Sequence, residues 1–471
     1  MFEMNRFYEQ ATAMADTLRA DRRALHGMPE LGMELTRTTA YVEQRLQQMG
    51  LEPTRLGGGL TVCIGPRKGP VFLLRGDMDA LKMQEASGLD FAATGECAHT
   101  CGHDLHTAML LGAAALLKER EADLPGRVKL MFQPAEENLK GAAAMVEAGV
   151  LKNPPVDAAM ALHVFPGPMY VGTLAWRQGP ALASSDSFRI LVRGKAGHGA
   201  IPQNAVDPLT IAAHILLALQ EVNAREVDPQ DPLVLTVCTI HGGELHNSIP
   251  ETVEMKGSIR AFSNHNRAHA RKRLVEICEG TAALFRGSCE VEFLAGVASL
   301  HNQPELAAEL AGYAGRIAKK MEELPRQMGS EDFAEVSQQV PSVFMGIGAG
   351  GPEEIYNRAG SHHPAVSLTR RCCRWARRCW RAALPTGWPP TQNNRRAIQQ
   401  TRAPGLPVRE KNGRFATTKA DKSAHGFGLA GMEEIARRCG GTLEAKAEEG
   451  RFALTVCIPL APSCENREGG V

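Results

Sequence analysis

The amino-acid sequence predicts an α/β fold in which a larger domain with a buried sheet is interrupted by a smaller α+β domain. Three apolar runs have the pattern of strands buried on both faces: 71–74, 128–132, which contains one lysine, and 158–162. Later runs alternate like half-exposed strands, with helical periods between them: 187–193, 208–222, 233–240, 253–262, 267–285 and 289–294. This order predicts a small antiparallel sheet with helices on one face. The first pattern returns after 294, so the smaller domain is an insertion.

Helical periods surround the buried runs. Apolar stripes predict helices over most of 4–50, where Gly50 ends the second helix, and over 107–117, 141–148 and 304–321. A further apolar run at 342–347 adds a strand to the larger sheet.

Bulk composition excludes several classes of protein. A chain of 471 residues is long enough for two or three domains, and its net charge of +1 gives no global field for nucleic acid or a membrane surface. The segment 1–20 is polar and lacks a signal peptide's apolar core. No run of about eighteen apolar residues predicts a membrane span. The twelve cysteines have no regular spacing, which predicts free thiols and a cytoplasmic protein.

The stretch 99–106, His-Thr-Cys-Gly-His-Asp-Leu-His, concentrates metal-binding side chains. Thiolate and imidazole are good ligands for zinc and similar metals. Gly102 allows a tight turn that can aim Cys101 and His103 at one point, and Asp104 is placed to orient a ligand. The alternative is a helix N-terminus with polar caps.

Polar residues follow each buried run, at Asp77, at Glu136 and Glu137, and at His163. The ends of such strands can meet at one edge of a sheet. The candidate metal ligands are Cys101, His103, Glu137, His163 and His362. Two metal ions there could activate a water molecule, with Glu136 as the general base. Each residue taken alone also has an ordinary structural explanation: a solvated helix start, a hydrogen-bonded histidine or a small buried cysteine.

Eight motifs, in order, resemble one known family: 75–81, 99–106, 132–137, 162–164, 197–200, 247–250, 329–333 and 362–364. The chain resembles the dinuclear metalloaminoacylases, which include N-acyl-amino-acid amidohydrolases, hippurate hydrolases and auxin-conjugate hydrolases. The resemblance runs from about residue 10 to residue 365.

The resemblance implies a discontinuous catalytic domain, 1–181 with 295–388, whose mixed sheet is flanked by helices, and a lid domain at 182–294 with an antiparallel sheet. It implies two divalent ions (Zn, Mn, Co or Ni) held by the five candidate ligands, with Glu136 as general base. The implied substrate is an N-acyl or N-aroyl amino acid or a related peptide-like conjugate.

The resemblance also implies roles in the lid. His198 would stabilise the tetrahedral oxyanion, commonly across a dimer interface, which implies a homodimer formed through the lid. Asn247 and Arg260 would contact the carboxylate end of the substrate, and Asp77 would support the ligands. The alternatives are a polar loop residue for His198, an exposed strand residue for Arg260 and a strand-end cap for Asp77.

The segment 369–388 departs from the family, because runs of Arg, Cys and Trp replace an expected acidic start and apolar helix. Read one base out of frame, GC-rich codons for 369–380 encode Asp-Glu-Ala-Val-Leu-Pro-Val-Gly-Ala-Ala-Leu-Leu. We therefore hypothesise a single-base deletion near the codon for Leu368; a gene sequence that is intact and in frame there would refute it. A basic nucleic-acid or membrane patch is the less favoured explanation.

After a linker at 389–413, the segment 414–462 resembles the last part of a histidine-kinase-type ATPase domain, with a glycine-rich phosphate loop at 425–429. The upstream Mg-binding helix and Asp-x-Gly-x-Gly loop are absent from this sequence. A partial α+β fragment cannot bury a full core, so we predict poor order and no ATP binding. The alternative functions are a metal-binding but catalytically impaired fusion product and a signalling ATPase module.

Overall fold

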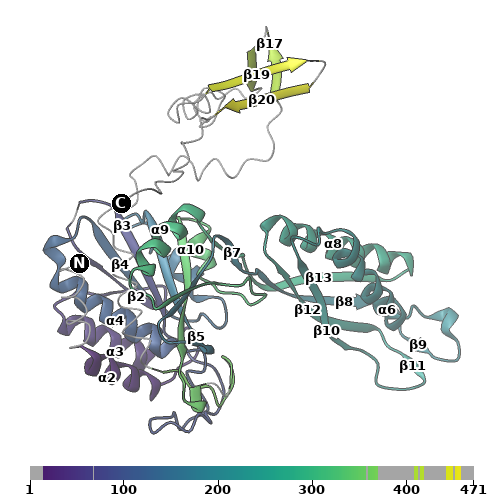
Figure 1. Cartoon of the computed structure of the whole chain (residues 1–471). Helices are drawn as coiled ribbons and strands as arrows, with labels where there is room; N and C mark the ends of the chain where they lie inside the picture. Colours follow the sequence, from purple (N-terminus) through teal and green to yellow (C-terminus); the bar gives the residue numbers. More distant parts are fainter. Residues whose placement is uncertain are drawn as a thin grey trace, which may run out of the picture. The chain divides into compact units, whose positions relative to one another are not determined.

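The computed structural model describes residues 14–66, 68–356 and 359–369, together with four strands between 408 and 457. The chain divides into two compact units, Met1–Pro389 and Pro390–Val471 (Figure 1). No helix in the described part of the chain is long and apolar enough to cross a bilayer.

An eight-stranded sheet forms the centre of the first unit, in the order β1-β2-β4-β3-β5-β16-β6-β15. Its strands are β1 (Thr54–Leu56), β2 (Gly59–Ile64), β3 (Val71–Asp77), β4 (Arg127–Gln133), β5 (Ala158–Tyr170), β6 (Thr173–Trp176), β15 (Lys320–Glu323) and β16 (Ser342–Gly350). The neighbours β4, β3, β5 and β16 are parallel, whereas β2 is antiparallel to β4 and β6 is antiparallel to β16. The predicted mixed α/β fold is confirmed.

Helices cover both faces of this sheet because its central strands are apolar on both sides. Phe72 and Leu74 of β3 belong to one core, and Val71 and Leu73 belong to the other. The first core includes residues of α2 (Ala15–His26), α3 (Thr36–Gln48), α4 (His103–Glu119) and α9 (Pro304–Gly315). The second includes residues of α5 (Gly141–Glu147) and α10 (Ala334–Ser337).

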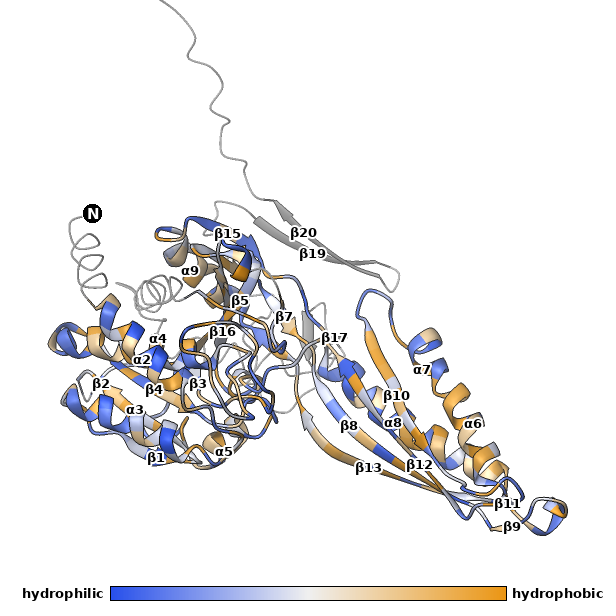
Figure 2. Ribbon diagram, turned by 90° about the horizontal axis from the view of Figure 1, so that it is seen from below, coloured by the Kyte–Doolittle hydropathy of each residue, from blue (hydrophilic) through white to orange (hydrophobic). Residues whose placement is uncertain are grey.

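The smaller sheet has the order β10-β12-β8-β13, and all its pairings are antiparallel. Its strands are β8 (Ser185–Arg193), β10 (Leu233–His241), β12 (Thr252–Ala261) and β13 (Ser288–Val297). The helices α6 (Pro208–Ala218), α7 (Gln220–Arg225) and α8 (Asn264–Leu284) lie along one face (Figures 1 and 2). Phe188, Ile190 and Val192 alternate toward that face and are buried, as the period-2 pattern predicts.

Three element boundaries differ from the prediction. The helix expected at 304–321 ends at Gly315, and Lys320–Glu323 instead pairs with β6 as β15. The helix expected at 208–222 is divided into α6 and α7. The strand expected to end at His163 continues to Tyr170, because its partner β16 extends to Gly350. For β15 and β5 a partner strand overrides the local period.

The second unit contributes two described hairpins, β17 (Val408–Lys411) with β18 (Arg414–Thr417) and β19 (Thr442–Glu448) with β20 (Arg451–Cys457). The predicted phosphate loop at 425–429 and the segment 370–388 lie outside the described residues.

A buried ionic network ties α2 to the start of α4. Asp104 accepts hydrogen bonds from Arg22 Nε at 2.9 Å and from His26 Nδ1 at 2.8 Å, and the other ring nitrogen of His26 lies 3.0 Å from Glu85. Burial opposes the charged form of His26, but the charge of Asp104 and the hydrogen bonds to both carboxylates raise its pKa to about 9.

We expect this network to make stability depend on pH. Unfolded His26 loses its proton near pH 6.5, whereas folded His26 keeps it to about pH 9, so its contribution is complete below 6.5 and is lost as pH rises through 9. In chemical denaturation, the stability difference between wild type and His26→Gln should shrink by about 3 kcal/mol at most across this window. A difference that stays constant from pH 6 to pH 10 would contradict the assignment.

Candidate active site

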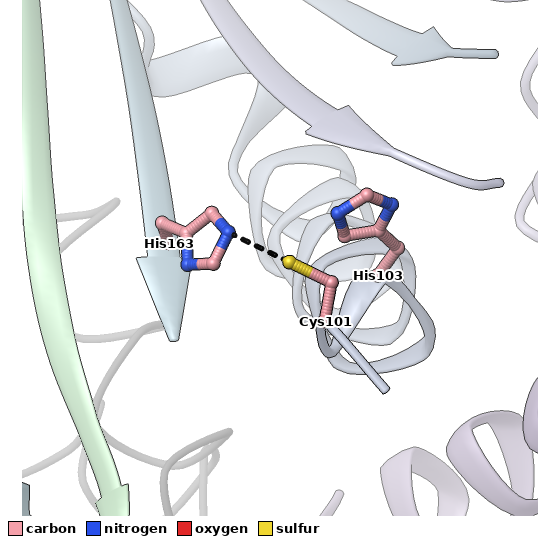
Figure 3. Close-up of side chains that lie close together, drawn as sticks. All are labelled: Cys101, His103 and His163. Carbon is pink, nitrogen blue, oxygen red and sulfur yellow. Dashed lines mark hydrogen bonds between the residues drawn. The ribbon is translucent and has the colours of Figure 1, made fainter. Parts of the chain in front are cut away.

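A left-handed turn presents the central ligand pair. Gly102, just before α4, has a φ of 99°, and a Cβ there would lie 2.4 Å from Val164 Cγ2 and 2.7 Å from Leu368 Cδ1. Only glycine fits this conformation and this close packing. The turn points Cys101 and His103 toward His163 on β5, whose ring faces the cysteine sulfur (Figure 3).

The five candidate ligands converge around this sulfur. Cys101 Sγ lies 3.4 Å from His163 Nε2 and 3.3 Å from His362 Nε2. Two groups of potential ligand atoms share the sulfur, one with His103 and His163 and the other with Glu137 and His362. These residues lie on a turn, the start of α4, a strand and two loops, as much as 261 positions apart.

The side chain of Asp79 holds the backbone of the paired glutamates. Asp79 accepts hydrogen bonds from the N–H groups of Glu136 at 3.0 Å and Glu137 at 3.1 Å. The two carboxylates then approach His103 Nε2 to 3.9 Å and 3.8 Å. Both glutamates form a group with His103, but Glu136 also forms one with Glu331 and Asp332, whereas Glu137 forms one with Cys101 and His362. The neighbouring glutamates therefore face different surroundings.

A buried guanidinium organises the acidic side of the site. Arg75 is fully buried and donates to Asp77 at 2.7 Å, to Glu331 at 2.8 Å and to Asp332 at 3.1 Å. Its Nε also donates to Gln133 at 2.8 Å. A charge so deeply buried requires such complete pairing.

The electrostatic environment separates the titratable groups. Burial raises the pKa of Glu136, and the nearby Glu331 and Asp332 raise it further. Burial also raises the pKa of Glu137 and of the Cys101 thiol, and it lowers the pKa of His163. Burial opposes ionisation of Asp77, but Arg75 and His103 outweigh it and hold its pKa well below the usual range.

The donor set fits divalent metal ions. Within the described residues, His103 Nε2 and Oε1 of Glu137 are buried without a hydrogen bond, while His103 Nδ1 lies 3.3 Å from Asp79 Oδ1. His103 Nε2 and Glu137 Oε1 nevertheless face each other at 3.8 Å. A cation between His103 Nε2 and Glu137 Oε1 would be bound by both atoms. The mixture of sulfur, nitrogen and oxygen donors suits zinc, manganese, cobalt or nickel.

Two neighbours of the ligands make contacts that the sequence did not predict. Asp104, expected to orient a ligand, is bonded instead to Arg22 and His26, and neither is a candidate ligand. His106, for which the sequence predicted no role, has its Nδ1 2.5 Å from Asp77 Oδ1 and accepts from the Val164 N–H at 2.9 Å. Asp77 lies 3.7 Å from His103 Nε2, so Asp77 and His106 lie directly beside the cluster.

A cavity of about 1120 Å³ opens beside the cluster. Four of the ligand candidates line it, and Glu136 and Arg260 do too: Cys101, Glu136, Glu137, His163, Arg260 and His362. Arg260 Nη1 donates to Ser330 Oγ at 3.0 Å. His198 and Asn247 are exposed and do not line this cavity; His198 pairs with Ser248 in a short ribbon.

Sequence reasoning assigned no role to Arg75, Asp79, Glu331 or Asp332. One signal was available for Arg75, because a charged residue stands inside a strand that is otherwise buried and apolar. Its partners Glu331 and Asp332 lie about 256 positions away, so no local pattern connects them.

The two-sheet fold and the clustered thiol, imidazole and carboxylate groups define a metallohydrolase-like protein. The model of peptidase family M20/M25/M40 matches residues 73–377, and the chain belongs to this family. It is therefore a hydrolase of amide bonds.

Relatives with several named activities share the family. N-acetyl-L-cysteine deacetylase of Bacillus subtilis is 36% identical over 351 residues, which cover 74% of this chain and 82% of that protein. IAA-amino acid hydrolase ILR1-like 4 of Arabidopsis thaliana is 38% identical over 343 residues, covering 69% and 76%. The crystal structure of the Bacillus subtilis YXEP protein, described as a dinuclear metal binding peptidase, has a TM-score of 0.68 at 31% identity and covers 79% of this chain and 98% of its own.

A weaker match, to the GHKL domain, covers residues 399–459. This match overlaps the segment 414–462, which resembles a histidine-kinase-type ATPase domain.

Proposed function

We propose that this chain hydrolyses the amide bond of N-acyl or N-aroyl amino acids through two divalent ions held by Cys101, His103, Glu137, His163 and His362. The convergence of these five side chains around the Cys101 sulfur carries the proposal. The B. subtilis relative described as dinuclear metal binding supports the number of ions. Bound ions would polarise the substrate carbonyl and acidify a water molecule.

Glu136 is the proposed general base. It lines the cavity, lies 3.9 Å from His103 Nε2 and remains outside the group that Cys101 forms with Glu137 and His362. Its raised pKa, caused by burial and then by Glu331 and Asp332, favours taking a proton from water and holding it. The same carboxyl group then delivers this proton to the leaving amine.

The cavity has two chemically different sides for the substrate. Arg260 is half-buried beside Ser330, and no ion pair is found for it in the described part of the chain. Such a guanidinium suits the free carboxylate of an amino acid. Phe165, Met169 and Leu182 line another part of the cavity, and the Phe165 ring lies 5.2 Å from the His163 ring. This wall suits a neutral apolar or aromatic acyl group.

A homodimer formed through the lid would explain the position of His198. Strand β10 is an edge of the smaller sheet, and Leu209, Leu217 and Ile240 are exposed on α6 and β10. A second copy could cover these apolar residues and bring its His198 to the cavity of the first as an oxyanion donor. Light scattering that shows a monomer, in a sample with full activity, would contradict this arrangement.

A cytoplasmic location also stays a prediction.

The direct test is hydrolysis of N-benzoyl and N-acetyl amino acids by the full-length protein with added Mn²⁺ or Zn²⁺. We expect amine release that a chelator abolishes and added metal restores, since every proposed ligand serves the ions. An otherwise identical substrate with an amidated carboxylate should bind more weakly, because it cannot pair with Arg260. Amide hydrolysis that is unchanged in metal-free protein would refute the proposed mechanism.

The altered segment after Leu368 supports one alternative, a metal-binding but impaired fusion product. Leu368 is buried and packs beside Gly102, which forms the ligand turn. The altered segment therefore begins directly after a residue that packs against this turn. Metal-loaded, soluble protein without activity would favour it, provided that restoring the predicted reading frame also restores hydrolysis.

A further inference from the structure

The loop 81–100 joins β3 to the ligand turn. It contains no helix and no strand beyond one isolated bridge, in which Leu81 and Ala98 exchange backbone hydrogen bonds of 3.1 Å and 3.0 Å. Cys101 follows directly. The loop therefore needs fixed contacts elsewhere if it is to deliver Cys101 and His103 in one geometry.

The same loop also holds the segment that carries His362. The backbone N–H of His362 donates to the Thr100 carbonyl at 3.1 Å, and the N–H of Ala86 donates to the Pro364 carbonyl at 2.8 Å. Ligand candidates from two distant parts of the chain are thus attached to one irregular segment. Movement of the loop would change the distance between His103 and His362.

The carboxylate of Glu85 binds other residues of the loop. Its carboxylate accepts hydrogen bonds from the Ala93 N–H at 2.7 Å and from the hydroxyl of Ser87. It also faces His26 Nε2 at 3.0 Å, and both side chains are buried. One carboxylate therefore connects two points of the loop to helix α2.

His26 extends this connection to the start of α4. Its Nδ1 lies 2.8 Å from Asp104, the residue after His103, while its Nε2 lies 3.0 Å from Glu85. Since both partners are carboxylates, both ring nitrogens donate, which requires the imidazolium form. The edge of Phe91, a residue of the same loop, packs at 5.1 Å from the His26 ring.

We propose that His26 is a positioning residue for the metal centre, which fixes the loop 81–100 to the first turn of α4 and so sets the relative positions of His103 and His362. This inference rests on the proposed metal site but not on the proposed substrate. His26 itself touches none of the five candidate ligands and acts through Glu85 and Asp104.

The test is the affinity for Co²⁺ and Mn²⁺, measured by chelator competition on the full-length protein. We expect His26→Gln and Glu85→Gln each to weaken metal binding about tenfold, in the range seen for residues that orient metal ligands. The double variant should weaken binding hardly more than either single variant, because both break the same connection. The absorption bands of the Co²⁺-loaded protein should also shift.

Asp21→Asn is the matched control. Asp21 is another buried charged residue of α2, bonded to Arg45 Nε at 2.7 Å and to the Tyr41 hydroxyl at 2.7 Å, both on α3. This variant should lower thermal stability and leave metal affinity unchanged. Equal loss of affinity in Asp21→Asn, or wild-type affinity in a folded His26→Gln protein, would overturn the inference. The readout needs no turnover, so it remains valid if wild-type protein hydrolyses no tested amide.

Discussion

Replacing Glu136 with glutamine is expected to lower kcat for N-acyl amino acid hydrolysis by about 10²–10⁴-fold, the usual contribution of a general base. Glutamine has the same shape but cannot accept and return a proton. Glu136 shares a group of possible ligand atoms with His103 and Glu137, but only Glu137 also joins Cys101 and His362, so metal content and substrate binding should persist. Steady-state kinetics with metal analysis on the same samples measures both quantities.

Glu137→Gln is the neighbouring control. It alters a proposed ligand one residue away on the same loop, so it should lose metal and activity together. A Glu136→Gln protein with wild-type kcat, or one that loses its metal as Glu137→Gln does, would remove Glu136 from the role of base.

Replacing Arg75 with leucine is expected to cost about 3–5 kcal/mol of folding free energy, the usual result of removing one partner from a buried ionic network. The substitution leaves Asp77, Glu331 and Asp332 buried without their cation. It also breaks the link between β3 and the loop that carries Glu331, because Arg75 is the residue that joins them. Urea denaturation monitored by circular dichroism measures the loss.

Arg55→Leu provides the comparison for this change. Arg55 pairs with Glu43 at 2.7 Å on the surface, where water screens the charges and the pair contributes little. The denaturation midpoint of Arg55→Leu should match that of wild type. If Arg75→Leu had an equally unchanged midpoint, the network around Arg75 would have no stabilising role.

Patterns of apolar residues were sufficient for the main elements of the fold. Strand β3 was predictable because residues 71–74 form a continuous apolar run. The structure buries Val71–Asp77 along its whole length, as that run predicts. The smaller sheet was predictable because Phe188, Ile190 and Val192 recur at every second position between Ser187 and Arg193. Strand β15 was not, since Lys320–Glu323 has no apolar pattern and exists through its pairing with β6.

The same division applies to the site. Spacing and residue chemistry, together with the family resemblance, identified Cys101, His103, Glu137, His163 and His362 as candidates before any distance was known. The different surroundings of Glu136 and Glu137 depend on Glu331, Asp332 and His362, which the fold brings from far along the chain. The partners of Asp104 likewise come from α2, so the local sequence could not predict its contact with His26.

The sequence by itself determined the α/β fold with an inserted antiparallel sheet and the inventory of metal-binding side chains. These properties follow from local periodicity and from the chemistry of neighbouring residues. Only the tertiary structure decided which carboxylate faces the ligand atoms, which carboxylates surround Arg75 and which helix fixes the ligand loop. The contacts of His26 with Glu85, of Arg75 with Glu331 and of Cys101 with His362 join residues from 59 to more than 250 positions apart, and no local interaction energy specifies such pairs.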